Sequence, residues 1–346
     1  MSYTIWARIY RWQMSVPVID LHCDLLAYLR VDPEKNSPLD PISNCSIPLL
    51  EKGKVRLQTL ALWSETAKGS YQRYLEELHA YHKMLRDFKE RVTSITDYDP
   101  AKKQVHFALA IENLSCLLEE GEPFEHLIER LKALDDPLLY VSLTWNEENR
   151  FGGGNLTQVG LKREGEIALE ILAEEGIAVD LSHTSDPLAD DILNYIHKKG
   201  LKLQPIASHS NFRSILNCPR NLPDVVAKEI ANLGGVIGIN FIRVFIGEQN
   251  EDFLKHIQYG IELLGPDVLA LGGDLFGGIE TPTLQDFAPY YLQFDSSACY
   301  PEFFHFLEKE LSHNQIQKIA HINAEQFLIK QGLIHKEEVN NGTCTP

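Results

Sequence analysis

The sequence lacks the features that mark membrane-spanning, secreted or disulfide-rich proteins. No stretch of its 346 residues approaches the roughly 18 consecutive apolar residues of a membrane-spanning helix. The first twenty residues contain no unbroken apolar core followed by a small-residue cleavage site, so a secretory signal is not expected. The six cysteines lie far apart, and none forms a Cys-x-x-Cys pair. We therefore expect a protein of the reducing cytoplasm.

Basic residues are also scarce. Subtracting 49 acidic from 32 basic residues leaves a formal charge of −17, spread along the chain. Such a surface repels phosphate backbones and anionic lipids, so we expect neither a nucleic-acid nor a membrane partner. The run Gly152–Gly154 lacks the lysine of a phosphate-binding loop. With 44% hydrophobic and 23% charged residues, the composition is that of an ordinary globular protein.

Short β-rich runs recur along the chain, and segments with helical spacing separate most of them. Several runs are apolar on both faces, as expected for strands buried between a barrel interior and surrounding helices. The pattern predicts a (β/α)8 barrel of the TIM type, with an open doubly wound sheet as the alternative. The eight candidate strands are Val16–Cys23, Val55–Trp63, Val105–Ile111, Leu138–Thr144, Gly176–Leu181, Leu203–Ala207, Val236–Phe241 and Val268–Leu271.

Helix signals fit this alternation. A helix is predicted to begin near Ser70, and another to have Asp186 as its N-cap, Pro187 in its first position and Gly200 at its end. A terminal helix over 314–331 is expected to pack on the outside. The predicted division is an N-terminal extension (1–16), the barrel (17–332) and a polar tail (333–346).

Two loops on the expected active face stand out. The first, 145–154, ends in three glycines, which permit tight or mobile backbone near a ligand. The second, 276–299, is rich in aromatic residues. Either could be a lid, and the second could instead be a subunit contact.

Five potential metal ligands follow separate apolar runs. His22 and Asp24 are two residues apart, so both side chains point the same way. Glu112, His183 and His209 each follow a later run, and parallel strands bring such residues to one mouth. Taken singly, each has a structural explanation, as a core histidine or a helix-capping carboxylate. Together they supply two sites sharing Glu112, and nitrogen and oxygen ligands favour zinc while leaving manganese, iron, cobalt or nickel open.

Two further residues are candidates for chemistry and binding. Asp274 follows the last predicted strand and two glycines, where a carboxylate could take a proton from water and return it to a leaving amine; otherwise it is a turn residue or helix cap. Arg220 lies after the sixth strand, where its guanidinium could hold a carboxylate with two hydrogen bonds. A solvated loop arginine is the alternative.

As a set, these motifs resemble the renal or membrane dipeptidase family, peptidase family M19 of the amidohydrolase-like barrels. The resemblance runs from about Pro17 to Gln331. The motifs that carry it are Ile19-Asp-Leu-His-Cys-Asp24, Ala110-Ile-Glu112, Leu143-Thr-Trp-Asn146, Ile177-Ala-Val-Asp-Leu-Ser-His183, Pro205-Ile-Ala-Ser-His-Ser210, Arg220-Asn-Leu-Pro-Asp224, Gly234-Gly-Val-Ile-Gly-Ile-Asn-Phe241 and Gly272-Gly-Asp274.

The resemblance implies a zinc-dependent exopeptidase that cleaves dipeptides, including those with a D-residue in second position, and that forms a homodimer. It assigns His22 and Asp24 to one ion and His183 and His209 to the other, with Glu112 bridging them. It also implies that Asp274 assists proton transfer and that Arg220 binds the substrate carboxylate.

The chain departs from the family pattern at two positions. Trp145 replaces a substrate-polarising histidine, so a metal, Asn146 or Asn149 must take that role, and Trp145 and Asn146 become candidate substrate-binding residues. Phe276 stands where a second aspartate is usual, which puts the substrate preference in question.

Our hypothesis is a metallo-dipeptidase in which a hydroxide bridging two divalent ions attacks the peptide bond. A second hypothesis keeps the metals but changes the substrate to an N-acyl amino acid, lactone or other small amide. A third is a metal-free scaffold or binding protein whose histidines are structural.

Overall fold

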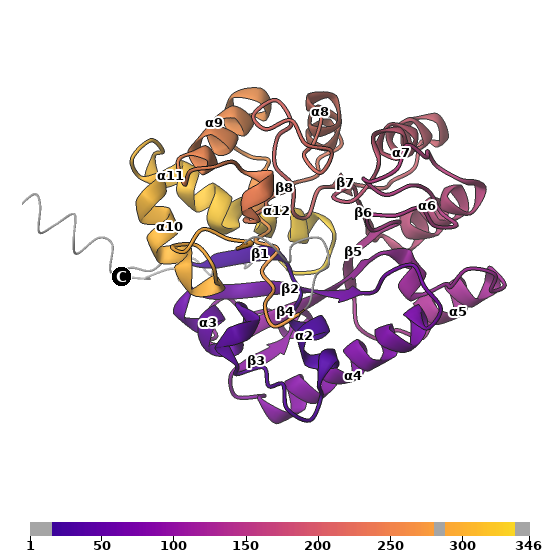
Figure 1. The fold of residues 1–346 in the computed structure, drawn as a ribbon, viewed down its shortest axis with the longest axis horizontal. Coiled ribbons are helices and arrows are strands. Elements are labelled where there is room, and N and C mark those ends of the chain that lie inside the picture. The colour runs from indigo at the N-terminus through magenta and orange to yellow at the C-terminus, as the bar shows by residue number, and fades with distance from the viewer. Residues whose placement is uncertain (1–15, 280–287, 336–346) are drawn as a thin grey trace, which may run out of the picture.

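Parallel strands and helices alternate along the chain in the computed structural model, which describes residues 16–279 and 288–335 (Figure 1). Eight strands follow one another in the order β7-β6-β5-β4-β2-β1-β9-β8, and a parallel bridge between Ala207 and Ile237 joins the two ends. The predicted (β/α)8 barrel is therefore confirmed. Its strands are β1 (Val18–Cys23), β2 (Val55–Trp63), β4 (Val105–Glu112), β5 (Leu138–Ser142), β6 (Ala178–Asp180), β7 (Pro205–Ile206), β8 (Ile237–Ile239) and β9 (Leu269–Leu271).

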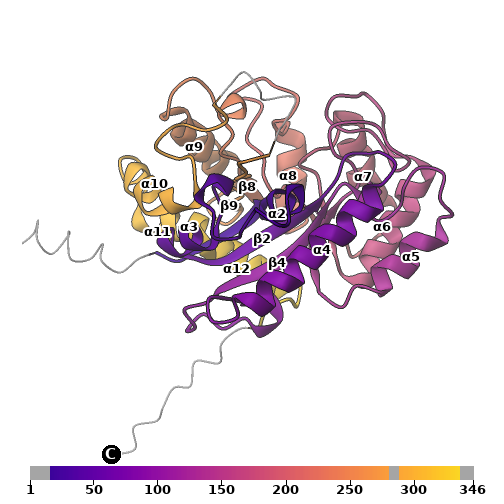
Figure 2. The ribbon, with the colours of Figure 1, turned by 60° about the horizontal axis from the view of Figure 1, so that its bottom comes forward.

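Helices surround these strands (Figures 1 and 2). They are α2 (Leu25–Val31), α3 (Ile47–Lys52), α4 (Ser70–Asp87), α5 (Glu125–Lys132), α6 (Arg163–Glu175), α7 (Asp186–Lys199), α8 (Asp224–Asn232), α9 (Asp252–Leu264), α10 (Tyr300–Leu307), α11 (His313–Gln317) and α12 (Asn323–Lys330). A short strand that the sequence pattern did not predict, β3 (Val92–Ser94), pairs with β4 outside the barrel order.

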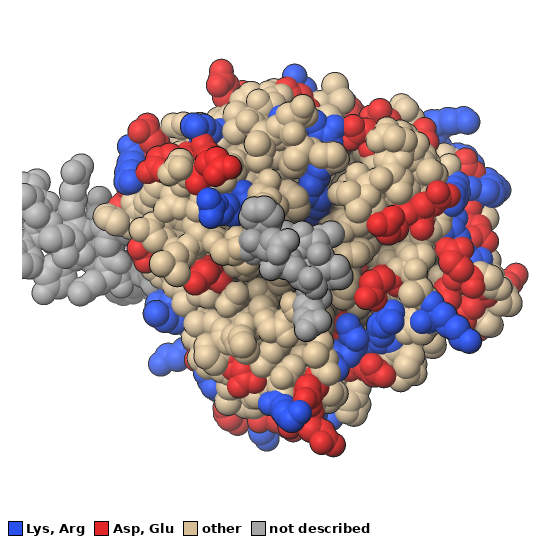
Figure 3. Space-filling model, viewed as in Figure 1, with Lys and Arg blue, Asp and Glu red and all other residues tan. Residues whose placement is uncertain are grey.

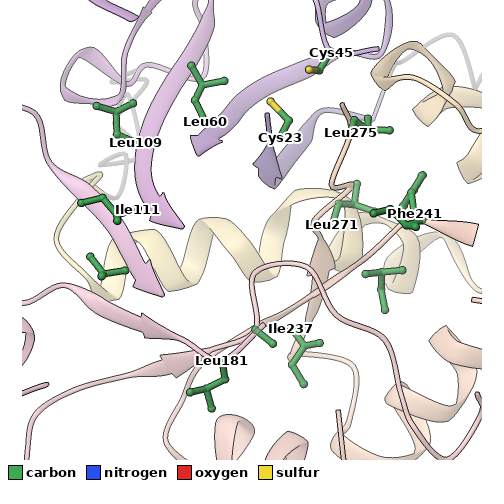
Figure 4. Close-up of a cluster of buried hydrophobic side chains, with 14 of the residues drawn as sticks. Cys23, Cys45, Leu60, Leu109, Ile111, Leu181, Ile237, Phe241, Leu271 and Leu275 are labelled. Carbon is green, nitrogen blue, oxygen red and sulfur yellow. The ribbon is translucent and has the colours of Figure 1, made fainter. Parts of the chain in front are cut away.

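The period-two pattern of the strands separates two apolar cores. In β4, Phe107, Leu109 and Ile111 belong to the large cluster between strands and helices, part of which is drawn in Figure 4. The alternating residues Ala108 and Ala110 belong to a second cluster, inside the barrel. The same alternation turns the last residue of the strand, Glu112, toward the barrel interior.

The C-terminal helices close one end of the barrel. Phe327 and Leu328 of α12 pack with inward-facing residues of the strands, among them Ile19 and Leu57. Between α11 and α12 the chain continues through a π-helical turn, Lys318–Ile322. The predicted terminal helix is thus present, but it covers the barrel interior instead of lying on the outer surface.

The capping residues predicted for α7 are correct to within one residue. Ser185, not Asp186, is the N-cap, because its hydroxyl accepts the N–H of Leu188 while Asp186 is already helical. Gly200 ends the helix with φ 63°, a left-handed conformation that glycine adopts without strain. The predicted start of α4 at Ser70 is correct.

The glycine-rich loop is fixed by hydrogen bonds. The Asn149 side chain donates to the Leu143 carbonyl and accepts the N–H groups of Phe151 and Gly152. A Cβ on Gly154 would lie 1.9 Å from the Trp145 carbonyl oxygen, so glycine there permits close packing.

In the second unusual loop, Tyr290, Tyr291 and Phe294 are buried, while Phe287 lies outside the described residues. The N-terminal extension except Val16, and the tail beyond residue 335, also lie outside them. The described helices include none with the length and apolar character needed to cross a membrane. On the face seen in Figure 3, acidic and basic side chains are interspersed.

Candidate active site

The five predicted metal ligands meet at one end of the barrel. His22 and Asp24 lie at the end of β1, Glu112 is the last residue of β4, and His183 and His209 follow β6 and β7. Two groups of ligand atoms within 4.8 Å of one another result, the first formed by His22, Glu112 and His209. The second consists of His22, Asp24 and the predicted proton carrier, Asp274.

The distances within the cluster match those between ligands of shared ions. Glu112 Oε2 lies 3.5 Å from His22 Nε2, and Glu112 Oε1 lies 2.8 Å and 3.5 Å from the Nε2 atoms of His183 and His209. Asp24 Oδ1 is 3.8 Å from His22 Nε2. Two ligand atoms on one tetrahedral zinc ion are about 3.4 Å apart, as the usual bond lengths require. Glu112 thus lies between the two predicted ligand pairs.

Hydrogen bonds at Nδ1 determine which nitrogen of each histidine faces the cluster. His22 Nδ1 lies 2.6 Å from the Tyr140 hydroxyl, which donates its own proton to the Leu21 carbonyl and so accepts the imidazole N–H. His183 Nδ1 lies 3.0 Å from Asn146 Oδ1, which can only accept. Both rings therefore direct the Nε2 lone pair toward the cluster, as metal-ligating histidines do.

A buried aspartate fixes the third histidine. His209 Nδ1 is 2.6 Å from Ser208 Oγ, which donates to Asp180 Oδ2 at 2.9 Å and so accepts from the ring. Asp180 is fully buried and accepts hydrogen bonds from five donors. These donors are the Ser142 hydroxyl and the hydroxyl and backbone N–H groups of Ser182 and Ser208.

The cluster contains more lone pairs than donors. His183 Nε2 and His209 Nε2 are 3.0 Å apart, and the buried His22 Nε2 has no hydrogen-bond partner. Burial, reinforced by the positive charge of Arg220, lowers the pKa of His22 to about 3 and that of His183 well below its usual value. Neutral imidazoles and a carboxylate facing one another repel unless a cation lies among them. These residues therefore fit divalent metal ions.

Burial shifts the pKa values of the carboxyl groups in the opposite direction, upward. Burial, followed by repulsion from Asp24 and Asp274, raises the pKa of Glu112 well above its usual value. Burial and Asp274 do the same for Asp24. In the absence of a cation, these acids therefore bind a proton more readily than ordinary carboxyl groups do.

Asp274 is held in an unusual backbone conformation. Its φ of 54° is left-handed, and its N–H donates to the His22 carbonyl while its own carbonyl accepts from Tyr290. Asn240 Nδ2 donates to Asp274 Oδ2 at 2.8 Å. Burial raises the pKa of Asp274 to about 6, although Arg220 opposes the rise. A strained carboxylate with a near-neutral pKa is suited to proton transfer.

Arg220 lies beside the cluster, and its Nε–H is unused. Its Nη1 donates to Ser210 Oγ, and its Nη2 lies 3.0 Å from His183 Nε2 and 3.1 Å from the His209 carbonyl. Its buried Nε–H has no hydrogen-bond partner, and among the described residues no carboxylate forms an ion pair with it. Burial lowers the pKa of this guanidinium. An incoming carboxylate would satisfy both the charge and the free donor.

A cavity of about 280 Å³ opens above these groups, and all the predicted catalytic and substrate-binding residues line it. His22 and His209 are fully buried and lie below its surface. The sequence did not indicate the roles of Tyr140, Asp180 and Asn240, which hold the site residues through hydrogen bonds, or of the cavity residue Trp63. Asn240 directly follows β8, so a search for polar residues at the ends of the predicted strands could have identified it.

A closed parallel barrel with nitrogen and oxygen ligands at one mouth defines a metal-dependent barrel hydrolase as the class of protein. The family model for membrane dipeptidase, peptidase family M19, matches residues 6–335. The chain therefore belongs to the membrane dipeptidase family, as the sequence motifs predicted.

Individual relatives agree with this membership. A Klebsiella pneumoniae protein described as lying in the pqqA 5′ region is 31% identical over 154 residues, which are 40% of this chain and 55% of that protein. The matched region thus spans about half the length of that relative. An uncharacterized dipeptidase of Schizosaccharomyces pombe is 26% identical over 342 residues, covering 88% of this chain and 78% of that protein.

Among solved structures, a metallo peptidase from Rhodobacter sphaeroides, liganded with a phosphinate mimic of the dipeptide L-Ala-D-Ala, has the same fold. Its TM-score is 0.78 at 19% sequence identity, and the superposition covers 91% of this chain and 99% of that one.

Proposed function

We propose that this protein is a metallo-dipeptidase that hydrolyses the peptide bond of dipeptides, L,D-dipeptides included, with two divalent ions. The observation that carries the proposal is the buried set of neutral imidazole and carboxylate ligand atoms directly beside an arginine with a free N–H. Membership of the dipeptidase family supports it, as does the dipeptide mimic in the Rhodobacter sphaeroides relative.

The proposed metal site uses five residues. His22 and Asp24 would hold one ion and His183 and His209 the other, with Glu112 shared. Because His22 also groups with His209, this division between the ions rests on the family resemblance. Zinc is the proposed native metal because the donors are imidazole and carboxylate. Divalent ions bound there would activate a water molecule and polarise the scissile carbonyl.

The remaining groups orient the substrate and move the proton. Arg220 would bind the free carboxylate of the dipeptide through its unused Nε–H, which limits substrates to those whose carboxylate lies one residue from the scissile bond. Asp274 would accept a proton from the attacking water and deliver it to the departing amine. Asn240, which donates to Asp274 Oδ2, leaves Oδ1 for that proton.

Activity and metal content test the proposal together. Purified full-length protein would be stripped with a chelator, reconstituted with zinc, manganese or cobalt, and supplied with matched L,L- and L,D-dipeptides. We expect about two ions per chain and hydrolysis that depends on them. Hydrolysis at the buffer rate in every metal-loaded preparation would refute the proposed activity.

A comparison with N-acetylated amino acids tests the second hypothesis. The apolar lining of the cavity, including Trp145 and Phe276, gives that hypothesis its support. Faster cleavage of N-acetyl-L-alanine than of L-Ala-L-Ala would favour an aminoacylase over a dipeptidase. We propose that the free dipeptide is the better substrate.

A further inference from the structure

The cavity has two apolar walls that face each other across the metal ligands. The last residue of β2 and residues after β5 form one, which we call the tryptophan wall: Trp63, Trp145 and Leu156. Residues after β8 and β9 form the other, the phenylalanine wall: Ile242, Val244, Phe245, Phe276 and Ile279. The strand order places β1 between the walls on one side and β6 and β7 on the other.

The tryptophan wall is built to stay in place. The rings of Trp63 and Trp145 meet edge to face, with centroids 5.1 Å apart and an angle of 71°. The backbone N–H of Trp63 donates to the fully buried carboxylate of Glu77 at 2.7 Å. Trp145 belongs to the loop that packs on Gly154, where no larger residue fits. The wall therefore requires little ordering when a substrate binds.

Arg220 determines which end of a dipeptide meets each wall. The Arg220 guanidinium carbon lies 5.7 Å from the centroid of the Phe245 ring, so this end of the cavity belongs to the phenylalanine wall. Arg220 also contacts His183, whose ring is 6.1 Å from that of Trp145, and Trp145 in turn contacts Trp63. Successive contacts therefore link Phe245 to Arg220, Arg220 to His183, His183 to Trp145, and Trp145 to Trp63.

The positions of Arg220 and the two walls separate the two substrate side chains. With the carboxylate on Arg220, the side chain of the C-terminal residue lies beside Phe245. The N-terminal residue is one peptide unit farther along, about 3.8 Å between Cα atoms, past the scissile carbonyl. We propose that Trp63 and Trp145 form the subsite for the N-terminal side chain and select large apolar or aromatic residues there. This inference rests on the proposed dipeptidase function and adds the substrate class.

Charge supports the same selection. Arg220 is the only lysine or arginine among the described residues that line the cavity, and the substrate carboxylate would occupy it. An acidic N-terminal side chain would have no lysine or arginine to meet. The ammonium group of a lysine side chain would be attracted to the indole faces, but it would lose hydration and meet no free carboxylate, because Asp24 and Glu112 would hold the ions. An aromatic side chain gains both apolar burial and edge-to-face contacts.

The test compares substrates that differ at one position. Metal-loaded wild-type protein would be assayed for kcat/KM with Phe-Ala, Leu-Ala, Ala-Ala, Asp-Ala and Lys-Ala, and with the reversed dipeptide Ala-Phe. We expect Phe-Ala to exceed Ala-Ala about 10- to 100-fold, the range that apolar pockets achieve. We expect Asp-Ala to fall below Ala-Ala and Lys-Ala to remain below Phe-Ala.

Variants then assign the preference to a wall. Trp63→Ala should lower the Phe-Ala to Ala-Ala ratio toward one, while Trp63→Phe keeps most of it. Phe245→Ala, on the opposite wall, should alter the Ala-Phe to Ala-Ala ratio and leave the Phe-Ala ratio unchanged. Val225→Ala, at an exposed position on α8 outside the cavity, controls for effects of mutation on stability. Thermal unfolding verifies that each variant is folded.

The outcomes separate this inference from the proposed function. If no dipeptide is cleaved by metal-loaded protein, the function itself fails. If dipeptides are cleaved but Phe-Ala and Ala-Ala are equal, or Trp63→Ala preserves the wild-type ratio, the function stands and the subsite assignment is overturned. A Phe-Ala to Ala-Ala ratio that responds to Phe245→Ala and not to Trp63→Ala would place the N-terminal side chain on the phenylalanine wall and would overturn the subsite assignment.

Discussion

Replacing Asn146 with leucine should weaken metal binding without removing a ligand. Asn146 Oδ1 accepts the Nδ1–H of His183 at 3.0 Å, and the His183 side chain is only 9% exposed, so water has little room to replace the lost acceptor. The ring is then free to rotate or to adopt the other tautomer, in which Nε2 carries the proton. Loss of such a supporting hydrogen bond typically lowers metal affinity about 10- to 100-fold, or roughly 1.4–2.7 kcal/mol.

The assay is a competition titration between the protein and a fluorescent zinc chelator, with zinc content measured independently. Asn146→Asp keeps an acceptor at the same place and should retain most of the affinity. Asn155→Leu is the matched control, because Asn155 lines the same cavity but its buried Oδ1 has no hydrogen-bond partner. A zinc affinity for Asn146→Leu within twofold of wild type would refute this reasoning.

Three further predictions follow from the site. Asp274→Asn should reduce kcat about 10²- to 10⁴-fold at saturating metal, as loss of a general acid–base group does; a smaller than tenfold loss would exclude proton transfer by Asp274. Zinc affinity should fall as the pH is lowered, because the raised pKa of Glu112 lets protons compete with the cation at a higher pH than they would at an ordinary glutamate; competition titrations at several pH values measure it, and an affinity that does not depend on pH would contradict the raised pKa. Gly154→Ala should destabilise the fold by about 1–3 kcal/mol, since its Cβ would overlap the Trp145 carbonyl; an unchanged Tm would show that the loop adapts freely.

The sequence was informative wherever burial leaves a periodic signal. Doubly apolar runs located the strands of the barrel, and β2 matches its predicted bounds, Val55–Trp63. Their positions at the ends of predicted parallel strands indicated that His22, Glu112 and His209 would converge, and their ligand atoms lie within 4.8 Å of one another. Chain connectivity alone brings these side chains together, because parallel strands present their carboxyl ends at one mouth.

The sequence was less informative about contacts between side chains. Tyr140 lies within a buried strand, where the sequence pattern indicates an ordinary core residue. Only the structure shows that its hydroxyl is hydrogen-bonded to His22 Nδ1. Asp180 belongs to a motif that carries the family resemblance, but the sequence did not indicate its role. Its five hydrogen bonds come from Ser142, Ser182 and Ser208, which lie in or just after three different strands. The packing of α12 across the barrel end depends on tertiary fit, which helical periodicity does not report. The homodimer, the cytoplasmic location and the division into extension, barrel and tail remain predictions.

The most direct test of the metal site is anomalous diffraction from crystals of the native protein, recorded on both sides of the zinc edge and of the neighbouring transition-metal edges. We expect two anomalous peaks, one beside His22 and Asp24 and one beside His183 and His209, with Glu112 between them. No peak within bonding distance of Glu112, about 2.2 Å for a zinc–carboxylate bond, would contradict it.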